Sequence, residues 1–283
     1  MRKRCFAHGL LLMILLFSCT AMSWAYETMP SSARALGLGG AGAVLPGGLG
    51  EVLALNPALL TTTNTGVNLF YTNKFAIPDF TEQSISLSWK TGKIHWASML
   101  LKDGAVLFED NQGDMHENQW QNFKLGIGFA MLLNKHMSLG LGLWTKEQTI
   151  AVAEDHDGLF GNNKDLFTTM GLYHDNLKFG MSAVIEGLMG NEGTQTKLAV
   201  RLGEKGKLMA LGEMNYEFSE SRMNGYAGVE AWLASNFAIR VGVDLAGMFT
   251  AGLGMGKGAW EIDYAYRVHP AGNAHYLGSG YRF

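Results

Sequence analysis

Apolar and polar residues alternate along most of the chain. Near the C-terminus, for example, the apolar residues Trp260, Ile262 and Tyr264 alternate with the acidic residues Glu261 and Asp263. Successive side chains of a β-strand point to opposite faces, so this alternation predicts strands with one apolar and one polar face. The apolar residues of these runs do not recur at the 3.6-residue spacing of an α-helix. In a membrane barrel, the apolar face contacts lipid.

The alternating runs are long for a soluble sheet. Many extend over about 9–12 residues, which a tilted strand needs to cross a bilayer, whereas globular strands are usually about 5–6 residues long. We therefore expect an all-β fold, an antiparallel transmembrane β-barrel of about fourteen strands, because bacterial barrels have an even number. The expected strands lie at residues 66–74, 81–90, 92–102, 119–132, 136–151, 166–174, 176–187, 194–203, 206–217, 224–234, 236–245, 247–256, 258–268 and 274–283.

The connections between these strands alternate in length. Every second connection is tight, as at Thr91–Gly92 and Ser235–Asn236, whereas Lys102–Asn118 and Val152–Asp165 are predicted to be long polar loops. Short turns at one rim and longer loops at the other are typical of outer-membrane barrels. The short connection near Ala246–Gly247 breaks this order, so a barrel of about twelve strands remains an alternative.

The end of the chain resembles the terminal signal of outer-membrane barrels. Leu277, Tyr281 and Phe283 share one face of the last expected strand, although Ser279 stands where an apolar residue is usual. The resemblance implies that the barrel-assembly machinery recognises these residues. The alternative is an edge strand that happens to be rich in tyrosine.

The first residues have the layout of a secretory signal. The basic stretch Arg2–Arg4 precedes the apolar run Leu10–Phe17, and small residues flank Trp24 at the expected cleavage site. The apolar run is too short for a spanning helix. We expect cleavage near Ala25, which assigns residues 1–25 to a signal peptide.

Both cysteines, Cys5 and Cys19, lie within this expected signal peptide. Cleavage near Ala25 therefore leaves no thiol for a disulfide, a metal site or thiol catalysis. The residues before Cys19 loosely resemble a lipoprotein processing site, so lipidation at Cys19 is an alternative to that cleavage.

Residues 26–63 do not alternate and contain two short motifs. The glycines of the first motif are Gly37, Gly39, Gly40 and Gly42, and the second motif is Asn56-Pro57-Ala58. The spacing of three of these glycines matches a dinucleotide-binding fingerprint, but neither a strand before it nor a βαβ unit supports that interpretation. Glycine permits close packing of one backbone against another.

The two motifs together resemble the start of the long-chain fatty-acid transporter (FadL-type) superfamily of outer-membrane barrels, and especially its PorV/PorQ-like branch. The resemblance covers the first forty residues after the signal peptide closely and the barrel only in pattern and size. It implies that residues 26–63 form a plug inside the lumen of a barrel at residues 64–283, and that Asn56, Pro57 and Ala58 lie in the lumen. Such a plug either seals the pore or gates a transport route.

Composition and motifs exclude several classes of function. The net charge of -3 gives no basic face for nucleic acid. Glycine is frequent, with 37 residues, which suits tight turns and small positions inside a barrel. The sequence has no hydrolase or protease motif, and its eight histidines have no metal-ligand spacing, so we expect no catalytic residues, no metal and no cofactor. The acidic run Glu154–Asp157 is interpreted as a solvated loop rather than a cation site.

Charged residues on the polar strand faces are expected to line the lumen. Charges in a confined lumen must be paired or hydrated, so these residues form either a network that stiffens the wall or a polar constriction that sets selectivity. The acidic residues are Glu186, Glu213, Glu230, Asp244, Glu261 and Asp263, and the basic residues are Lys124, Lys178, Lys197, Arg201, Arg240 and Arg267.

The sequence thus predicts a non-enzymatic barrel in the outer membrane of a Gram-negative-type bacterium. The first hypothesis is a passive conduit for small hydrophobic or amphipathic molecules, which follows from the resemblance. The alternative is a PorV-like accessory barrel that binds envelope proteins of a secretion or surface-assembly system, and structural scaffolding alone is a further possibility. The expected partners of the barrel are outer-membrane lipid and the assembly machinery.

Overall fold

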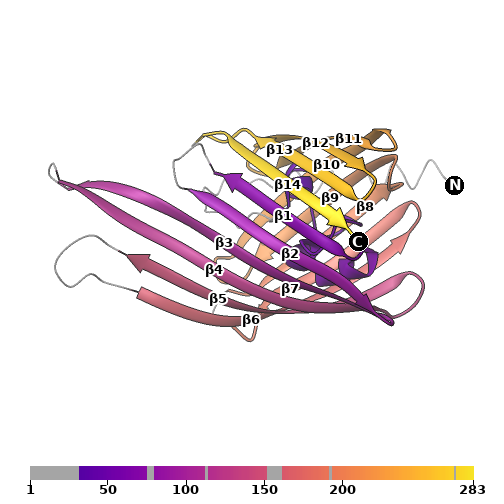
Figure 1. Ribbon diagram of the computed structural model, residues 1–283, viewed down its shortest axis with the longest axis horizontal. Coiled ribbons are helices and arrows are strands. Elements are labelled where there is room, and N and C mark those ends of the chain that lie inside the picture. The colour runs from indigo at the N-terminus through magenta and orange to yellow at the C-terminus, as the bar shows by residue number, and fades with distance from the viewer. Residues whose placement is uncertain (1–31, 75–79, 112–113, 152–160, 191–192, 271) are drawn as a thin grey trace.

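A computed structural model describes residues 32–283 except 75–79, 112–113, 152–160, 191–192 and 271. Within these residues, fourteen antiparallel strands form a closed barrel in which each strand pairs with its neighbours in sequence and β1 pairs with β14 (Figure 1). The predicted fold class and strand number are confirmed. No helix in the described part of the chain is long and apolar enough to cross a membrane.

The strands follow the predicted order closely. Their bounds are β1 Gly66–Asn73, β2 Thr81–Thr91, β3 Ile94–Asn111, β4 Asp114–Leu132, β5 Met137–Ala151, β6 Gly161–Asn176, β7 Phe179–Leu188, β8 Gln195–Gly203, β9 Leu208–Glu217, β10 Arg222–Ala234, β11 Phe237–Asp244, β12 Phe249–Lys257, β13 Trp260–Arg267 and β14 Ala274–Arg282. The β11–β12 turn around Ala246–Gly247 is therefore a true connection between two strands, and the twelve-strand alternative is wrong.

The outer face of the wall is apolar and the inner face is polar or small. In β4, Phe123, Leu125 and Ile127 are exposed on the outside, whereas Gly126 and Gly128 are buried on the inside. The same alternation runs through β12, where Leu253 is exposed and its neighbours are buried. Exposed apolar side chains around a closed barrel are stable only against lipid, so this surface is the membrane-facing band.

One predicted loop is wrong. Most of Lys102–Asn118 belongs to β3 and β4, which pair along their whole length and project well beyond the other strands (Figure 1). The predicted loop Val152–Asp165 is shortened in the same way, since β6 begins at Gly161. In the first stretch, residues 105–108 are all apolar and the residues after them are mostly polar, so the alternation that marks a membrane strand is missing there. The acidic run Glu154–Asp157 lies outside the described residues.

Lys178 is not a lumen residue. The β6–β7 turn occupies positions 177–178, and Lys178 is exposed there, whereas the predicted strand 176–187 placed it inside the barrel. Asn176 explains the difference, because its Oδ1 accepts hydrogen bonds from the Lys178 and Phe179 amides and closes the turn.

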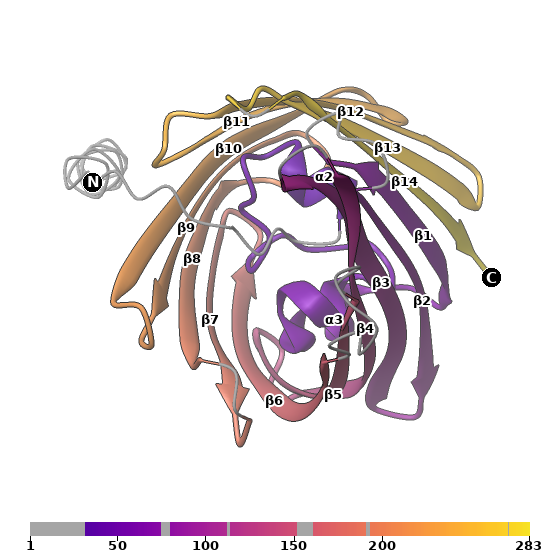
Figure 2. The same cartoon turned by 90° about the vertical axis from the view of Figure 1, so that its left-hand side faces the viewer.

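The N-terminal segment, here residues 32–63, lies inside the ring of strands (Figure 2). It contains the short helices α2 Ala33–Leu36 and α3 Val52–Leu55 and the 3-10 helix η1 Pro57–Thr62. Helix α2 packs against β12–β14, and η1 packs against β3–β6. The predicted signal peptide 1–25 and Cys19 lie outside the described residues.

Glycine allows the N-terminal segment to touch the wall backbone. Gly39 has a φ of 78°, and a Cβ there would lie 2.7 Å from the Val243 carbonyl oxygen. On the wall side, a Cβ on Gly228 would lie 2.6 Å from the Leu38 carbonyl oxygen, and Gly242 faces Gly39 in the same way. Side chains at these positions would push the segment away from β10 and β11, so glycine on both surfaces sets their separation.

Candidate functional site

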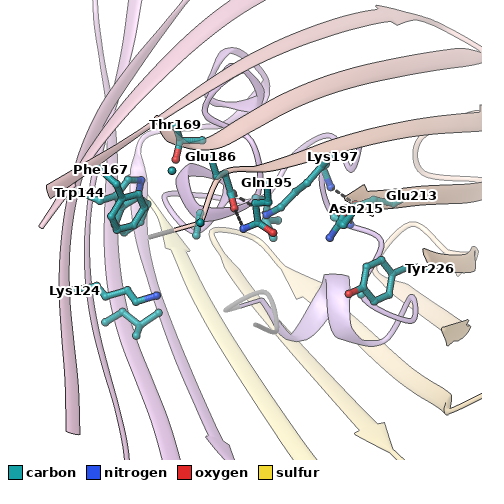
Figure 3. Close-up of a pocket in the computed structure, with 18 residues that line it drawn as sticks. Lys124, Trp144, Phe167, Thr169, Glu186, Gln195, Lys197, Glu213, Asn215 and Tyr226 are labelled. Carbon is teal, nitrogen blue, oxygen red and sulfur yellow. Dashed lines mark hydrogen bonds and ion pairs between the residues drawn. The ribbon is translucent and has the colours of Figure 1, made fainter. Parts of the chain in front are cut away.

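The candidate site is a cavity of about 150 Å³ between the N-terminal segment and the inner wall. Strands β3–β10 form its wall, and residues 40–43 and 54–55 form its floor. Glu186 and Gln195 flank the β7–β8 connection, which places the cavity toward the rim from which β3 and β4 project. Figure 3 shows the lining, which is Gly40, Gly42, Ala43, Ala54, Leu55, Leu101, Lys124, Trp144, Phe167, Thr169, Glu186, Gly187, Gly193, Gln195, Lys197, Glu213, Asn215 and Tyr226.

One side of the cavity is aromatic. Trp144 of β5 and Phe167 of β6 are paired in register and stack with ring centroids 6.2 Å apart and planes within 6° (Figure 3). Both rings are buried, and the Trp144 ring lies over Gly126, where a side chain would collide with it. Stacked rings of this kind give a flat apolar surface for a ligand.

The opposite side is polar, and its carboxylates are already occupied. Lys197 Nζ lies 2.7 Å from Glu186 Oε1, and Gln195 donates to the other oxygen of Glu186. Glu213 Oε2 accepts hydrogen bonds of 2.8 Å from the backbone amides of Gly42 and Ala43. The Glu213 bonds tie β9 to the N-terminal segment, the Glu186 bonds join β7 to β8, and both carboxylates are thereby occupied.

Lys124 differs from the other charged groups of the cavity. Its side chain points toward the cavity beside Trp144 and Phe167 (Figure 3), and no hydrogen bond or ion pair joins it to another described residue. Lys146 of β5 lies directly opposite Lys124 in register, and Asp165 of β6 lies opposite Lys146. Two like charges on neighbouring positions repel each other, whereas the Asp103 carboxylate of β3 attracts Lys124 electrostatically.

The predicted lumen charges separate into two groups. Lys124, Glu186, Lys197 and Glu213 line the cavity, whereas the other lumen charges form ion pairs away from it. Arg34 of α2 and Arg240 of β11 both bind Glu230, at 2.7 Å each, and Arg240 also lies 2.6 Å from Asp263. The remaining pairs are Arg267 with Asp244, Arg282 with Glu261, and Arg201 with Asp175.

Some of these pairs join adjacent strands, as Arg240 does with Glu230 between β11 and β10. Others reach across one intervening strand, as Arg267 does with Asp244 between β13 and β11, so the pairs connect the wall sideways. Glu230 is fully buried, and the Trp232 indole nitrogen donates a further hydrogen bond of 2.9 Å to it. A buried carboxylate with two guanidinium partners is compensated, whereas the same carboxylate alone would be very costly. The Arg34–Glu230 pair also fixes α2 to the wall.

Asn56, Pro57 and Ala58 lie below the cavity, in the lumen. The Asn56 amide donates to the Ala43 carbonyl at 2.9 Å, and its oxygen accepts from the Ala58 amide at 2.9 Å, which caps η1. Gly171 of β6 leaves space for the Asn56 side chain. Gly40 and Gly42 line the cavity, whereas Gly37 and Gly39 pack against the wall.

Glu51 is a buried acid in the N-terminal segment. Its Oε2 accepts a hydrogen bond of 2.9 Å from the Leu49 amide. Burial, followed by repulsion from Glu261, raises the pKa of Glu51 to about 7. The carboxyl therefore titrates near neutral pH while it is buried in the docked segment.

Sequence reasoning identified Glu186, Lys197 and Glu213 as lumen residues but not the aromatic side of the cavity. The signal for Trp144 was present, because it interrupts the series of small inward-facing residues Gly140 and Gly142 on β5. The described residues contain no group of three or more His, Cys, Asp or Glu side chains able to hold a metal ion.

The C-terminal residues lie on the outer face of the barrel. Leu277 and Phe283 are exposed, and Tyr281 packs edge-on against Phe283 and at a tilt against Trp260, at centroid distances of 5.7 and 4.7 Å. The Phe283 amide donates to the Thr65 carbonyl at 3.0 Å, next to β1, so the end of the chain closes the ring.

Comparison with known proteins finds similarity in structure alone. No family model and no curated protein matches the sequence. The CymD monoaromatic hydrocarbon channel has a TM-score of 0.66 at 12% identity, over 92% of this chain and 99% of the other. The toluene transporter TodX of P. putida has a TM-score of 0.66 at 8% identity over the same shares.

A Pseudomonas aeruginosa FadL homologue is similar at a TM-score of 0.61 and 10% identity, over 92% of this chain and 99% of the other. These identities are too low to transfer residues or ligands. The chain described here is therefore a fourteen-stranded barrel with the fold of these outer-membrane channels.

Proposed function

We propose that this protein is a passive conduit in the outer membrane for small hydrophobic or amphipathic molecules. The observation that carries the proposal is the cavity between the N-terminal segment and the wall, with an aromatic side at Trp144 and Phe167 and a polar side at Glu186 and Lys197. A largely apolar concave site with a few fixed polar groups is the usual form of a small-molecule site.

The structural comparisons support the proposal without deciding it. Two of the barrels with this fold are described as a monoaromatic hydrocarbon channel and a toluene transporter. Because one fold can serve many functions, the support for this chain comes from its own cavity.

The first experiment measures single-channel conductance in a planar bilayer, with the processed chain and with a form that lacks residues 26–63. Conductance that arises only after the deletion means that the N-terminal segment obstructs a route through the barrel. The absence of conductance in both forms means that side chains fill the barrel, and it contradicts the conduit.

The second experiment tests the cavity itself by the uptake of radiolabelled toluene into intact Gram-negative host cells. We expect the wild-type protein to raise initial uptake and Thr169→Trp to return it to background, because Thr169 lines the cavity. Met170→Trp is the matched control, since the adjacent side chain points to the other face of β6. Equal uptake by wild type and Thr169→Trp would remove the cavity from the route.

The accessory-barrel hypothesis is not carried further. It depended on two long outer loops as docking surfaces, and the first of these is the paired hairpin of β3 and β4. Residues 152–160 of the second lie outside the described part of the chain. Recognition of Leu277, Tyr281 and Phe283 by the assembly machinery stays a prediction, as does cleavage near Ala25.

A further inference from the structure

We propose that the cavity binds a small carboxylic acid with a single aromatic ring, whose carboxylate pairs with Lys124 and whose ring lies against Trp144 and Phe167. This inference rests on the proposed conduit and names its ligand class. It predicts a preference for an aromatic anion over the neutral molecule of the same shape.

The size of the cavity limits the ligand to one ring. Its volume is about 150 Å³. An apolar protein cavity of roughly 150 Å³ is known to accept benzene. The buried pair of Trp144 and Phe167, with planes within 6°, gives a flat wall against which such a ring packs. A long aliphatic chain would not fit within this volume.

The charges of the cavity favour an anion. Glu186 is held by Lys197 and Gln195, and Glu213 is held by two backbone amides, so neither carboxylate is open to a cationic ligand. Lys124 alone among the described charged groups of the lining has no such partner. A ligand carboxylate would give it one and would add a charge-assisted hydrogen bond.

The neighbours of Lys124 strengthen this preference. Lys146 lies directly opposite on β5, and its own neighbour on the other side is Asp165. The nearest acidic residue on β3 is Asp103. It is paired with Asn122 and is the next inward-facing residue of β3 after Leu101, which is paired with Lys124. No ion pair joins Asp103 to Lys124 in the structure. An anion between the lysine and the rings would add a direct ion pair to the longer-range attraction of Asp103 for Lys124.

The geometry also fixes the orientation. Lys124 is paired with Lys146 in the β4–β5 register. Trp144 is the preceding inward-facing residue of β5, and it is paired with Gly126. The carboxylate therefore lies toward the rim from which β3 and β4 project, and the ring lies toward the N-terminal segment. Tyr226, on the far side of the cavity, is buried and completes the apolar enclosure.

The test compares the binding of benzoate and its neutral isostere benzamide by calorimetry, with the protein in lipid nanodiscs at neutral pH. We expect wild type to bind benzoate more tightly than benzamide. Lys124→Met should weaken benzoate binding about tenfold, the size of one charge-assisted hydrogen bond, and leave benzamide unchanged. Lys178→Met, in the exposed β6–β7 turn, is the matched control and should bind as wild type.

Two further variants keep the test decisive. Lys124→Arg retains the charge and should retain the benzoate preference, even where Lys124→Met folds poorly. Trp144→Leu should weaken both ligands, because it removes the ring contact and not the charge. Equal affinity of wild type for the two ligands, benzoate binding that is unaffected by Lys124→Met, or no binding of either ligand would overturn the proposal. Toluene uptake by host cells that express the same protein separates the two failures, since a conduit without anion preference would still raise that uptake.

Discussion

Asn56 shows how one side chain sets the path of the N-terminal segment. It caps η1, binds the Ala43 carbonyl and fits against Gly171, so three parts of the molecule meet at one amide. The side chain is fully buried, and its bonds have no water to replace them.

We expect Asn56→Ala to destabilise the docked segment by about 1–3 kcal/mol, because it leaves buried backbone groups unpaired. Urea unfolding in detergent, followed by hydrogen exchange of residues 56–62, measures the effect. The control is Asn64→Ala, since Asn64 is exposed, and it should change little. Equal effects of the two substitutions would contradict the assigned role of Asn56.

Gly171→Ala tests the same contact from the wall. A Cβ at Gly171 would overlap the Asn56 side-chain oxygen, so we expect the substitution to weaken docking of the segment. In a chain that lacks residues 26–63, the same substitution should be nearly neutral, because nothing is left to collide with it. An equal loss of stability in both backgrounds would mean that the clash lies elsewhere.

Glu51 makes docking dependent on pH. Its pKa in the docked segment is about 7, above the usual 4.5, so the docked state favours the protonated form. Docking is therefore strongest below about pH 4.5 and weakens as the pH rises toward 7. Hydrogen exchange of residues 49–55 across this pH range measures the strength of docking. Glu51→Gln should remove the pH dependence. An unchanged pH profile in that variant would assign the titration to another group.

Alternation predicted the strands well because one face of each must meet lipid. It failed at 103–118, where residues 105–108 are all apolar and the following residues are mostly polar, and at Lys178, because the turn closed by Asn176 lies later in the chain than predicted. Alternation is a local property of sequence, and a strand without one lipid-facing side carries no such signal.

The cavity was much less predictable than the strands. Its lining comes from β3–β10 and from the N-terminal segment, and its residues meet only when register and barrel closure are known. The sequence marked Glu186 and Lys197 as inward-facing charges, but their pairing depends on the β7–β8 register, which places Glu186 opposite Gln195. The stacking of Trp144 on Phe167 likewise depends on the β5–β6 register.

Each outward strand face can be tested by one charged substitution. Leu253 lies at the middle of β12 and is exposed on the outside. We expect Leu253→Lys to destabilise the barrel by about 2–4 kcal/mol, the cost of a lysine near the bilayer midplane. Reversible unfolding in lipid vesicles measures the cost, and Leu253→Met, which preserves volume and polarity, is the control. A lysine tolerated as well as methionine would place this face away from lipid.

The attachment of α2 to β10 depends on one buried ion pair. We expect Arg34→Met to loosen α2 and to lower its hydrogen-exchange protection, at a cost of about 3 kcal/mol, the lower end for a broken buried pair because Arg240 still neutralises Glu230. Lys207→Met breaks only an exposed pair in a turn and should have no measurable effect. Unchanged protection of residues 36–40 in Arg34→Met would show that α2 is held by packing alone.

At the scale of the whole molecule, we expect the barrel wall to form without the N-terminal segment. The barrel closes through the pairing of β1 with β14, and residues 32–63 contribute no strand to the sheet. Removal of residues 26–63 should therefore preserve the β-sheet circular dichroism spectrum, while the midpoint of thermal unfolding falls because buried apolar contacts are lost. A deletion variant that fails to form a barrel would show that the segment is needed to build the wall.

The contacts of α2 also imply an order of events during folding. Arg34 pairs with Glu230, 196 positions later in the chain, and Gly39 packs against β11. The first described residues can therefore reach their final place only after β10 and β11 have formed. Contacts between such distant positions form slowly. We therefore expect the interior of the barrel to be filled later than these strands pair, at a rate set by how quickly the first residues return.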